Sequence, residues 1–317
     1  MSWPRRTARS TVGGLRDLSP GGAATIGWSG PARAEDAPAT VDLVCHVRGD
    51  GDLLHAWLDH YVALGVTRFH FIAHGRKSDN EALYRLPPRY PAVIVDAYDG
   101  VFHDVEKQRR VQAVLTGLRG RWVVTVDSDE MLELPYEDLP TTISMLERLK
   151  ATALSAPMVQ RLREDGRLET PEVIADPFGA MPLCAPALYA TMGVEACIAK
   201  YPLFLNTDTV VVNPGYHVCP DGRRTRLSGL RGVTHHFKWR APVLQRLRER
   251  ADSGHAFRHE SAGYLAYLGV HGYRLPVTGA FRHSRKRLFR RGLLRSARGR
   301  DWMRLFVGSL RSAPATR

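Results

Sequence analysis

The order of apolar segments in the first half of the chain constrains the fold most strongly. Four short apolar runs typical of buried strands are separated by segments whose apolar residues have helical spacing. The expected strands cover 41–47, 66–73, 92–97 and 122–126, and the expected helices between them cover 53–64, 81–86 and 105–118. This alternation predicts an α/β fold with a Rossmann-related, mostly parallel sheet and helices on both faces.

The pattern loosens after residue 130. Helices are expected at 139–149, 242–250 and 262–268, and strands at 151–160 and 209–212. Residues 165–230 are rich in proline, glycine and short apolar runs, a composition typical of loops that shape a binding pocket. We therefore expect this half to receive a substrate.

Charge is distributed unevenly along the chain. Residues 282–317 carry twelve Lys and Arg and one acidic residue, whereas residues 41–281 carry 28 basic and 28 acidic residues. A neutral body argues against a specific nucleic-acid partner. The predicted organisation is a disordered segment at 1–39, one domain at 40–281 with halves at 40–134 and 135–281, and a basic amphipathic tail at 282–317.

The basic tail has two interpretations. Eleven Lys and Arg between 282 and 311 are interleaved with Leu, Phe and Trp, which on a helix would suit an anionic membrane surface. The alternative is a disordered tail with nonspecific affinity for polyanions. No apolar run is long enough for a transmembrane helix. We expect a cytoplasmic protein, peripheral at the inner face of the membrane.

The cysteines agree with that location. The chain has four, Cys45, Cys184, Cys197 and Cys219, and they are widely spaced without a Cys-x-x-Cys pair. This spacing argues against a zinc ribbon and fits a reducing compartment. Cys45 lies in the first expected strand and is interpreted as a small buried hydrophobe.

The expected strand 122–126 runs directly into Asp127-Ser-Asp129-Glu130. Residues i and i+2 of an extended chain point the same way, so Asp127 and Asp129 can face one point. Because an unpartnered buried carboxylate is expensive, we expect the pair where the strand leaves the sheet, which is where open α/β sheets bind ligands. Two carboxylates suit Mg²⁺ or Mn²⁺ carrying phosphate oxygens. The alternative is an acidic turn or helix N-terminus.

A second polar cluster, His235-His236-Phe-Lys238-Trp239, comes late in the chain. Neutral imidazole is a good ligand, so one histidine is expected on the metal or diphosphate unless the two form a satisfied surface pair. Lys238 would add a positive charge to phosphates or be solvated. Trp239 would stack on a sugar or base, or lie in the core.

Taken in order, these landmarks resemble a known family over roughly residues 41–270. The similar motifs are Val47-Arg48-Gly49-Asp50, Trp57, Leu64-Gly65-Val66, Ser78-Asp79, Gln108, Val126-Asp127-Ser128-Asp129-Glu130-Met131 and His235-His236-Phe237-Lys238-Trp239. The chain resembles bacterial glycosyltransferase family 2-like proteins, in the group related to family 92 glycosyltransferases. The resemblance implies a GT-A fold and metal-dependent, inverting transfer from a nucleotide-sugar to a glycan, lipid-linked or other hydroxyl acceptor.

The resemblance also implies roles for single residues. Expected metal ligands for Mn²⁺ or Mg²⁺ are Asp127, Asp129, His235 and His236, with Asp127 also facing the ribose or sugar as a catalytic residue. Expected donor-binding residues are Arg48, Asp50, Asp79, Asp96, Gln108, Asp127, Lys238 and Trp239. For Asp79 and Asp96 the alternative is loop capping, for Arg48 an ion pair, and for Gln108 an exposed helical position.

Two positions depart from the family pattern. An Asn-Glu pair after the first strand is replaced by Gly49-Asp50, and a Glu before Trp57 is replaced by Ala56. If the family's Glu contacts base or ribose, Asp50 would replace it with a shorter reach. The resemblance therefore does not specify the nucleotide.

An inverting transfer needs a carboxylate that deprotonates the acceptor hydroxyl. Glu260 is the expected base, with Asp165 or Glu169 as alternatives, because it follows the second polar cluster. Two other functions compete with sugar transfer. One is a degenerate, non-catalytic binding protein of the same fold. The other is a metal-dependent phosphohydrolase, although no second cluster of His and Asp supports it.

Overall fold

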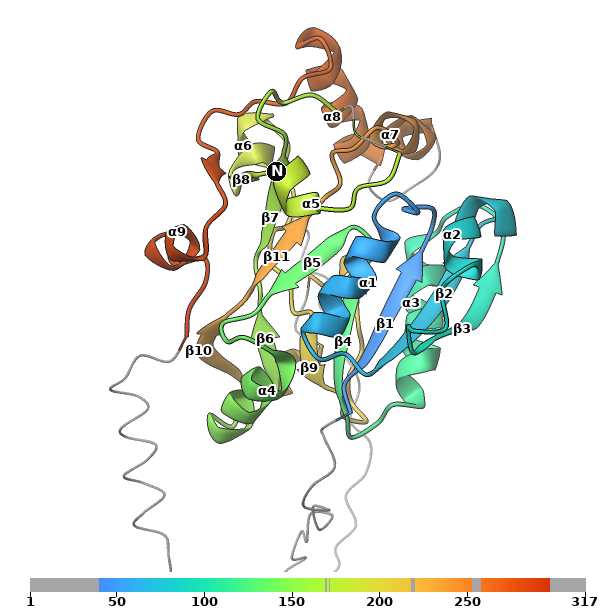
Figure 1. The fold of residues 1–317 in the computed structure, drawn as a ribbon, viewed down its shortest axis with the longest axis vertical. Helices are drawn as coiled ribbons and strands as arrows, with labels where there is room; N and C mark the ends of the chain where they lie inside the picture. Colours follow the sequence, from blue (N-terminus) through green and yellow to red (C-terminus); the bar gives the residue numbers. More distant parts are fainter. Residues whose placement is uncertain (1–39, 169, 171, 218–219, 253–257, 297–317) are drawn as a thin grey trace, which may run out of the picture. The chain divides into compact units, whose positions relative to one another are not determined.

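The computed structural model describes residues 40–168, 170, 172–217, 220–252 and 258–296. They form an α/β fold with two sheets, which confirms the predicted fold class (Figure 1). The predicted disordered segment at 1–39 and residues 297–317 of the predicted tail lie outside the described residues.

The larger sheet contains the four strands predicted in the first half of the chain. Its order is β10-β6-β9-β4-β1-β2-β3. The strands are β1 (Asp42–Val47), β2 (Arg68–His74), β3 (Ala92–Tyr98), β4 (Trp122–Asp127), β6 (Ala153–Ser155), β9 (Leu203–Leu205) and β10 (Leu227–Arg231). Strands β1 to β4 are parallel, as predicted, whereas β9 is antiparallel to both β4 and β6. The carboxyl ends of β1 and β4 therefore lie side by side.

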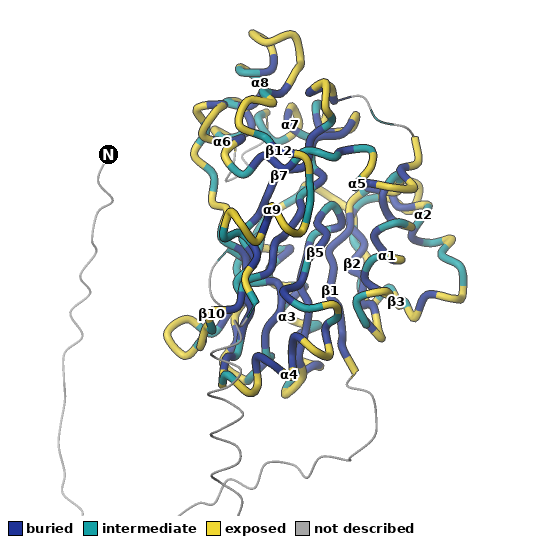
Figure 2. Tube along the Cα trace, turned by 60° about the vertical axis from the view of Figure 1, so that its left-hand side comes forward, coloured by how far each residue is buried: buried dark blue, intermediate teal, exposed yellow. Residues whose placement is uncertain are grey.

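Helices cover both faces of this sheet, as predicted. Trp57 of α1 (Leu54–Ala63) packs in the cluster that holds Leu43 and Cys45 of β1. Val111 of α3 (Asp104–Thr116) packs in another cluster with Val44, whose side chain faces the opposite side of β1. Helix α1 ends before Gly65, whose φ of +96° favours glycine. Figure 2 shows that burial follows the strands of both sheets.

The second sheet brings the two polar clusters of the sequence together. Its order is β12-β8-β7-β11-β5. The strands are β5 (Glu130–Glu133), β7 (Met158–Leu162), β8 (Leu183–Ala185), β11 (Val233–His236) and β12 (Phe281–Arg282). Strand β5 follows β4 after a turn of two residues and pairs antiparallel with β11, so that His236 stands opposite Glu130. The acidic turn and the histidine segment are thus neighbours.

Two predicted strands in the second half are wrong. The segment 151–160 forms β6 and β7, which belong to different sheets and are separated at Pro157, a residue without an N–H to donate. Residues 209–212 form no strand; Val210 and Val212 pack as loop residues against the large sheet. The strand of this region that joins the large sheet is β9, and a strand of three residues is too short to give a clear sequence pattern.

The remaining helices are mostly short. They are η1 (Lys77–Asn80), α2 (Glu81–Tyr84), α4 (Leu139–Arg148), α5 (Pro177–Ala180), α6 (Leu188–Thr191), η2 (Pro214–Tyr216), η3 (Gly222–Arg224), α7 (Val243–Asp252), α8 (Arg258–Val270) and α9 (Arg285–Arg290). Helices α2, α4, α7 and α8 agree with predicted helices. No helix in the described ranges has the length and apolar character needed to cross a bilayer.

Residues 281–296 pack on the small sheet. Strand β12 pairs with β8, and Leu288 and Leu294 are fully buried in a cluster with Val233 of β11. The interpretation that these two leucines face a membrane is therefore wrong, because they complete the core of the domain. Trp302 and the other apolar residues farther along lie outside the described residues.

Candidate functional site

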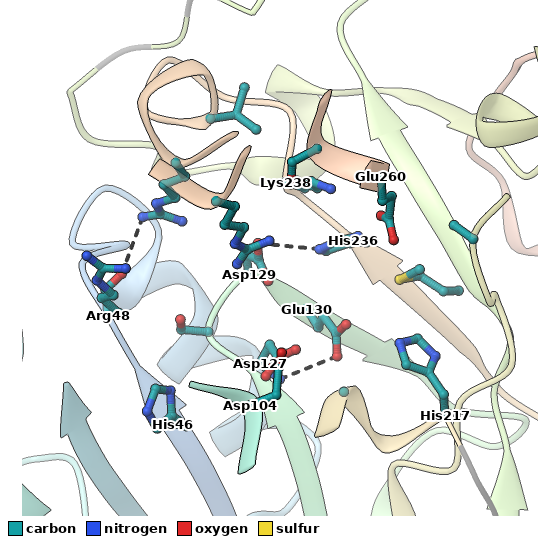
Figure 3. Close-up of a pocket in the computed structure, with 18 of the residues that line it drawn as sticks. His46, Arg48, Asp104, Asp127, Asp129, Glu130, His217, His236, Lys238 and Glu260 are labelled. Atoms are coloured by element: carbon teal, nitrogen blue, oxygen red, sulfur yellow. Dashed lines mark hydrogen bonds and ion pairs between the residues drawn. The ribbon is translucent and has the colours of Figure 1, made fainter. Parts of the chain in front are cut away.

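A pocket of about 240 Å³ lies where β1 and β4 end, below α7 and α8 (Figure 3). Its walls come from the end of β1, the turn between β4 and β5, the end of β11 and the two helices. It brings together seven of the predicted site residues: Arg48, Asp50, Asp127, Asp129, His236, Lys238 and Glu260. The two polar clusters of the sequence, the acidic turn and the histidine segment, therefore meet in one pocket.

The pocket is not lined by four of the predicted donor-binding residues: Asp79, Asp96, Gln108 and Trp239. Asp79 accepts hydrogen bonds from the backbone and guanidinium of Arg76 at the start of η1. Asp96 accepts from Arg110 Nη1 at 2.5 Å. Gln108 lies on the partly exposed side of α3. Asp79 therefore caps a loop, Gln108 lies at a partly exposed helical position, and Asp96 forms an ion pair.

Trp239 and His235 also lie outside the pocket. Trp239 is buried, packs edge-on against Tyr264 with 5.2 Å between ring centroids, and donates from Nε1 to Gln160 Oε1 at 2.9 Å. It is a core residue rather than a platform for a sugar. His235 precedes His236 on β11, and successive side chains of a strand point to opposite faces. His235 is therefore directed away from the pocket, toward Glu133.

Asp127 is held by two ammonium groups. Lys107 of α3 donates to Asp127 Oδ1, and Lys200 Nζ lies 3.9 Å from Oδ2. Burial raises the pKa of Asp127, but the two lysines outweigh it and bring the pKa down to about 2. One oxygen of Asp127 is therefore hydrogen-bonded to Lys107, and the other lies near a second cation.

Glu130 lines the pocket and holds the turn between β4 and β5 in place. Lys200 Nζ donates to its Oε1 at 2.6 Å, and its Oε2 accepts from the backbone N–H of Asp127 at 3.3 Å. Burial raises the pKa of Glu130, whereas the adjacent carboxylates raise the pKa of Lys200 despite its burial. The side chain of Glu130, the first residue of β5, thus holds the backbone of Asp127 in place.

Asp50 is fully engaged by protein groups. Its Oδ1 accepts from Arg240 and, at 2.8 Å, from Arg246, and its Oδ2 accepts from Ser128 Oγ at 2.6 Å. Burial opposes ionisation, but the two arginines lower the pKa of Asp50. Gly49 and Asp50 both have positive φ, at +75° and +60°. Gly49 and Asp50 therefore make a sharp turn after β1, and the carboxylate of Asp50 binds Arg246 of α7.

Asp129 and His236 form the part of the pocket that fits a divalent ion best. Asp129 Oδ2 lies 3.4 Å from His236 Nε2, and two ligands of one ion lie about 3–3.5 Å apart. His236 lowers the pKa of Asp129 against the effect of burial. Within the described residues, no third His, Cys, Asp or Glu converges on this pair. One carboxylate plus substrate phosphates is a common setting for Mg²⁺.

The tautomer of His236 is set by its neighbours. Trp239 can only donate, so Gln160 must turn its oxygen to Trp239 and its amide N–H to His236 Nδ1, at 3.0 Å. Neutral His236 then carries its proton on Nε2 and donates to Asp129. His236 would bind a metal ion only after Gln160 turned its amide. The carboxylate of Asp129 can therefore bind a metal ion without this rearrangement, whereas His236 cannot.

Basic groups on the far wall face the two aspartates. Arg246 and Arg250 come from α7, and Lys238 follows β11. Lys238 Nζ lies 4.2 Å from the centre of the Tyr264 ring. Burial, assisted by Arg250, lowers the pKa of Lys238 to about 8. At neutral pH this wall is cationic, which suits an anionic ligand.

Glu260, the predicted base, lies in the first turn of α8 and lines the pocket (Figure 3). Its Oε1 accepts a hydrogen bond from Tyr264 Oη at 2.6 Å. The alternative Asp165 lies elsewhere, where it accepts from Arg163 Nε and from the Arg167 backbone at 3.1 Å each. Glu169 lies outside the described residues.

Sequence reasoning missed the two lysines that hold Asp127. A signal for Lys107 exists, because it stands four and eight residues before Val111 and Leu115 on the buried stripe of α3. A lysine at the end of an apolar stripe needs an acidic partner. Lys200 gave no such signal, because it lies in an irregular segment.

The chain was compared with protein families, curated proteins and solved structures. No protein-family model and no curated protein matches the chain. Among solved structures, S. aureus TarS 1–349 matches with a TM-score of 0.33 and 8% identity, over 73% of this chain and 72% of that chain. Another S. aureus TarS structure matches with a TM-score of 0.32 and 10% identity, over 76% and 45% respectively. Matches this distant do not indicate the function of this chain.

Proposed function

We propose that the protein transfers a sugar from a nucleotide-sugar donor to a hydroxyl acceptor. The observation that carries the proposal is the pocket itself. It places the carboxylates that follow β4 opposite a cationic wall, at the carboxyl ends of parallel strands. The family resemblance of the motifs supports the GT-A interpretation of this arrangement.

The donor would lie across the ends of β1 and β4. Arg246, Arg250 and Lys238 supply the positive charge that a diphosphate needs. Phe102 and His46 form an aromatic wall at the other side of the pocket, with ring centroids 5.9 Å apart. We assign the diphosphate to the cationic wall and the nucleobase to the aromatic one.

A divalent ion, Mn²⁺ or Mg²⁺, would be held by Asp129 together with diphosphate oxygens. Such an ion would stabilise the negative charge that develops on the leaving diphosphate. We assign the ion to Asp129 rather than to Asp127, because Lys107 donates to one oxygen of Asp127 and Lys200 lies 3.9 Å from the other. Instead, Asp127 and its lysines would present a fixed polar surface to the sugar or ribose.

Glu260 would act as the base of an inverting transfer. The acceptor hydroxyl gives its proton to the Glu260 carboxylate while its oxygen forms a bond to the anomeric carbon. The bond from that carbon to the diphosphate breaks, and the nucleoside diphosphate leaves with the electron pair. The hydrogen bond from Tyr264 fixes the carboxylate for this role.

Glu260→Gln tests this assignment. The amide keeps the shape of the side chain but cannot take a proton, so we expect kcat to fall about a hundredfold. The dissociation constant of the donor should stay unchanged. The measurement is release of nucleoside diphosphate from the best donor and acceptor, and Asp165→Gln serves as the control. Equal losses in both variants would remove Glu260 from the mechanism.

The pKa of Lys238 predicts how donor binding depends on pH. Lys238 is protonated below its pKa of about 8 and loses its charge as the pH rises through that value. The terminal phosphate of a nucleoside diphosphate is already ionised, with a pKa of about 6. We therefore expect affinity for the diphosphate to fall about tenfold between neutral pH and pH about 9. Titration calorimetry should find this dependence in the native protein and a flat profile in Lys238→Met.

A non-catalytic role is the second candidate. The observation that favours it is Asp50, the acidic residue after β1 that lines the pocket, because Arg240, Arg246 and Ser128 bind both of its oxygens. In that case a nucleotide-sugar would bind without release of its nucleoside diphosphate. The turnover assay described for Glu260 separates the two functions.

The acceptor side opens toward α8, and we propose a glycan or lipid-linked acceptor there. The basic side chains of α9, among them Lys286, Arg287 and Arg290, are exposed and suit an anionic membrane surface. The protein would then be peripheral to the membrane, as predicted. The contact with the membrane would be made by these basic side chains rather than by the buried leucines.

A further inference from the structure

A second group of ligand atoms lies on the face of the small sheet that is turned away from the pocket. It consists of Glu133 at the end of β5, His235 of β11 and His283 after β12. His235 and His236 are neighbours on one strand, so the first faces this group and the second faces the pocket. The two sites therefore use different side chains.

The three ligand atoms lie at distances typical of a metal centre. Glu133 Oε2 is 2.9 Å from Nε2 of His235 and 2.9 Å from Nε2 of His283. All three atoms lie within 4.8 Å of one another. An ion at about 2.0–2.2 Å from each ligand separates the ligands by about 3–3.5 Å, and both distances from Glu133 to a histidine are close to this range.

The surroundings orient these ligands. Arg285 Nη1 lies 3.3 Å from the other oxygen of Glu133, and its Nη2 donates to the backbone of Pro135 at 2.9 Å. Oε1 is thereby engaged and Oε2 is directed at the imidazoles, as for a carboxylate that binds metal through one oxygen. Phe178 packs against both rings, with centroid distances of 5.2 and 5.3 Å, which limits their rotation.

We propose that Glu133, His235 and His283 bind a zinc ion. Two imidazoles and one carboxylate are a set that suits Zn²⁺, whereas Mg²⁺ and Mn²⁺ prefer oxygen ligands. His235 is fully buried, but the side chain of His283 is 26% exposed, so an ion can enter and water can fill a fourth position.

The bound ion would fasten the C-terminal segment to the domain. Glu133 and His235 belong to paired strands of the sheet, whereas His283 belongs to the segment that continues into α9. Beyond the two-residue strand β12, that segment is held by the burial of Leu288 and Leu294 and by a backbone bridge between Arg295 and Arg231 of β10. The inference is independent of sugar transfer, because no residue of the pocket takes part.

The test uses the full-length protein, stripped with a chelator and then titrated with Zn²⁺ against a chromophoric competitor. We expect about one equivalent bound with micromolar affinity or tighter, and binding at least about tenfold weaker in His283→Ala. Zinc should also raise the melting temperature of the native protein and not that of the variant. His283 is chosen because it is partly exposed, so that its loss leaves the core intact.

Two matched controls separate this site from others. His271→Ala removes an exposed histidine that stacks on Tyr267, and should bind zinc like the native protein. His217→Ala removes a histidine of the pocket, where Cys197 also lies. Unchanged zinc binding in His283→Ala, loss of binding in His217→Ala alone, or no binding in the native protein would each overturn the proposal. In the last case the three residues form only a hydrogen-bonded clamp.

Discussion

Replacing Asp129 by Asn should lower kcat/KM for sugar transfer about a thousandfold. Asn keeps the size of the side chain but removes the charge that would hold the divalent ion against the diphosphate. Loss of a Lewis acid is worth several kcal/mol, and about 4 kcal/mol corresponds to about three factors of ten. The measurement is release of nucleoside diphosphate at a range of Mn²⁺ concentrations, where the variant should no longer respond to the metal.

Asp165→Asn is the matched control for the Asp129 variant. It removes an equal charge from a loop carboxylate that binds Arg163 and lies outside the pocket. The control should keep its activity and its Mn²⁺ dependence. If Asp129→Asn keeps both as well, the assignment of the metal to Asp129 is wrong, and the positive side chains of the pocket would have to stabilise the leaving group alone.

Replacing Asp50 by Asn should lower the free energy of unfolding by about 3 kcal/mol. Arg240 is 1% exposed and Asp50 is one of its two carboxylate partners, the other being Asp52. Removing one partner of a buried ion pair costs about 3–5 kcal/mol, and the remaining Asp52 places this variant at the lower end. Asn tolerates the left-handed backbone at this position, so the loss reports on charge rather than on strain.

Urea denaturation measures this effect, as a lower midpoint with an unchanged slope. The control is Asp79→Asn, which breaks an exposed ion pair with Arg76 and should leave the midpoint unchanged. Equal midpoints for the two variants would contradict the view that Asp50 and its arginines anchor α7 to the end of β1.

The sequence was sufficient for the parallel part of the fold. Strands β1 to β4 are each long enough to show an apolar run, and Gly65 marks the end of α1. The second half was harder, because β6 and β9 have three residues each and their positions depend on pairing with distant strands. Local patterns carry little information about such strands.

Site residues that directly follow a strand could be predicted from the sequence. Residues that reach the site from distant parts of the chain could not. Asp129 and His236 lie in one pocket because the first follows β4 in the turn to β5 and the second is the last residue of β11. The error for His235 could have been avoided, since alternate residues of a strand cannot face the same pocket. Lys200 contacts Asp127 and Glu130 from an irregular segment about seventy residues away, and only the folded structure brings these groups together.

Binding of nucleoside diphosphates, measured by thermal shift with and without Mn²⁺, tests the central claim most directly. We expect the nucleoside diphosphate of one base to stabilise the protein in a Mn²⁺-dependent way, by about 2.7 kcal/mol at a hundred times its dissociation constant. Asp129→Asn should abolish the metal dependence of this shift. If no nucleoside diphosphate stabilises the protein under either condition, the pocket is not a nucleotide-sugar site.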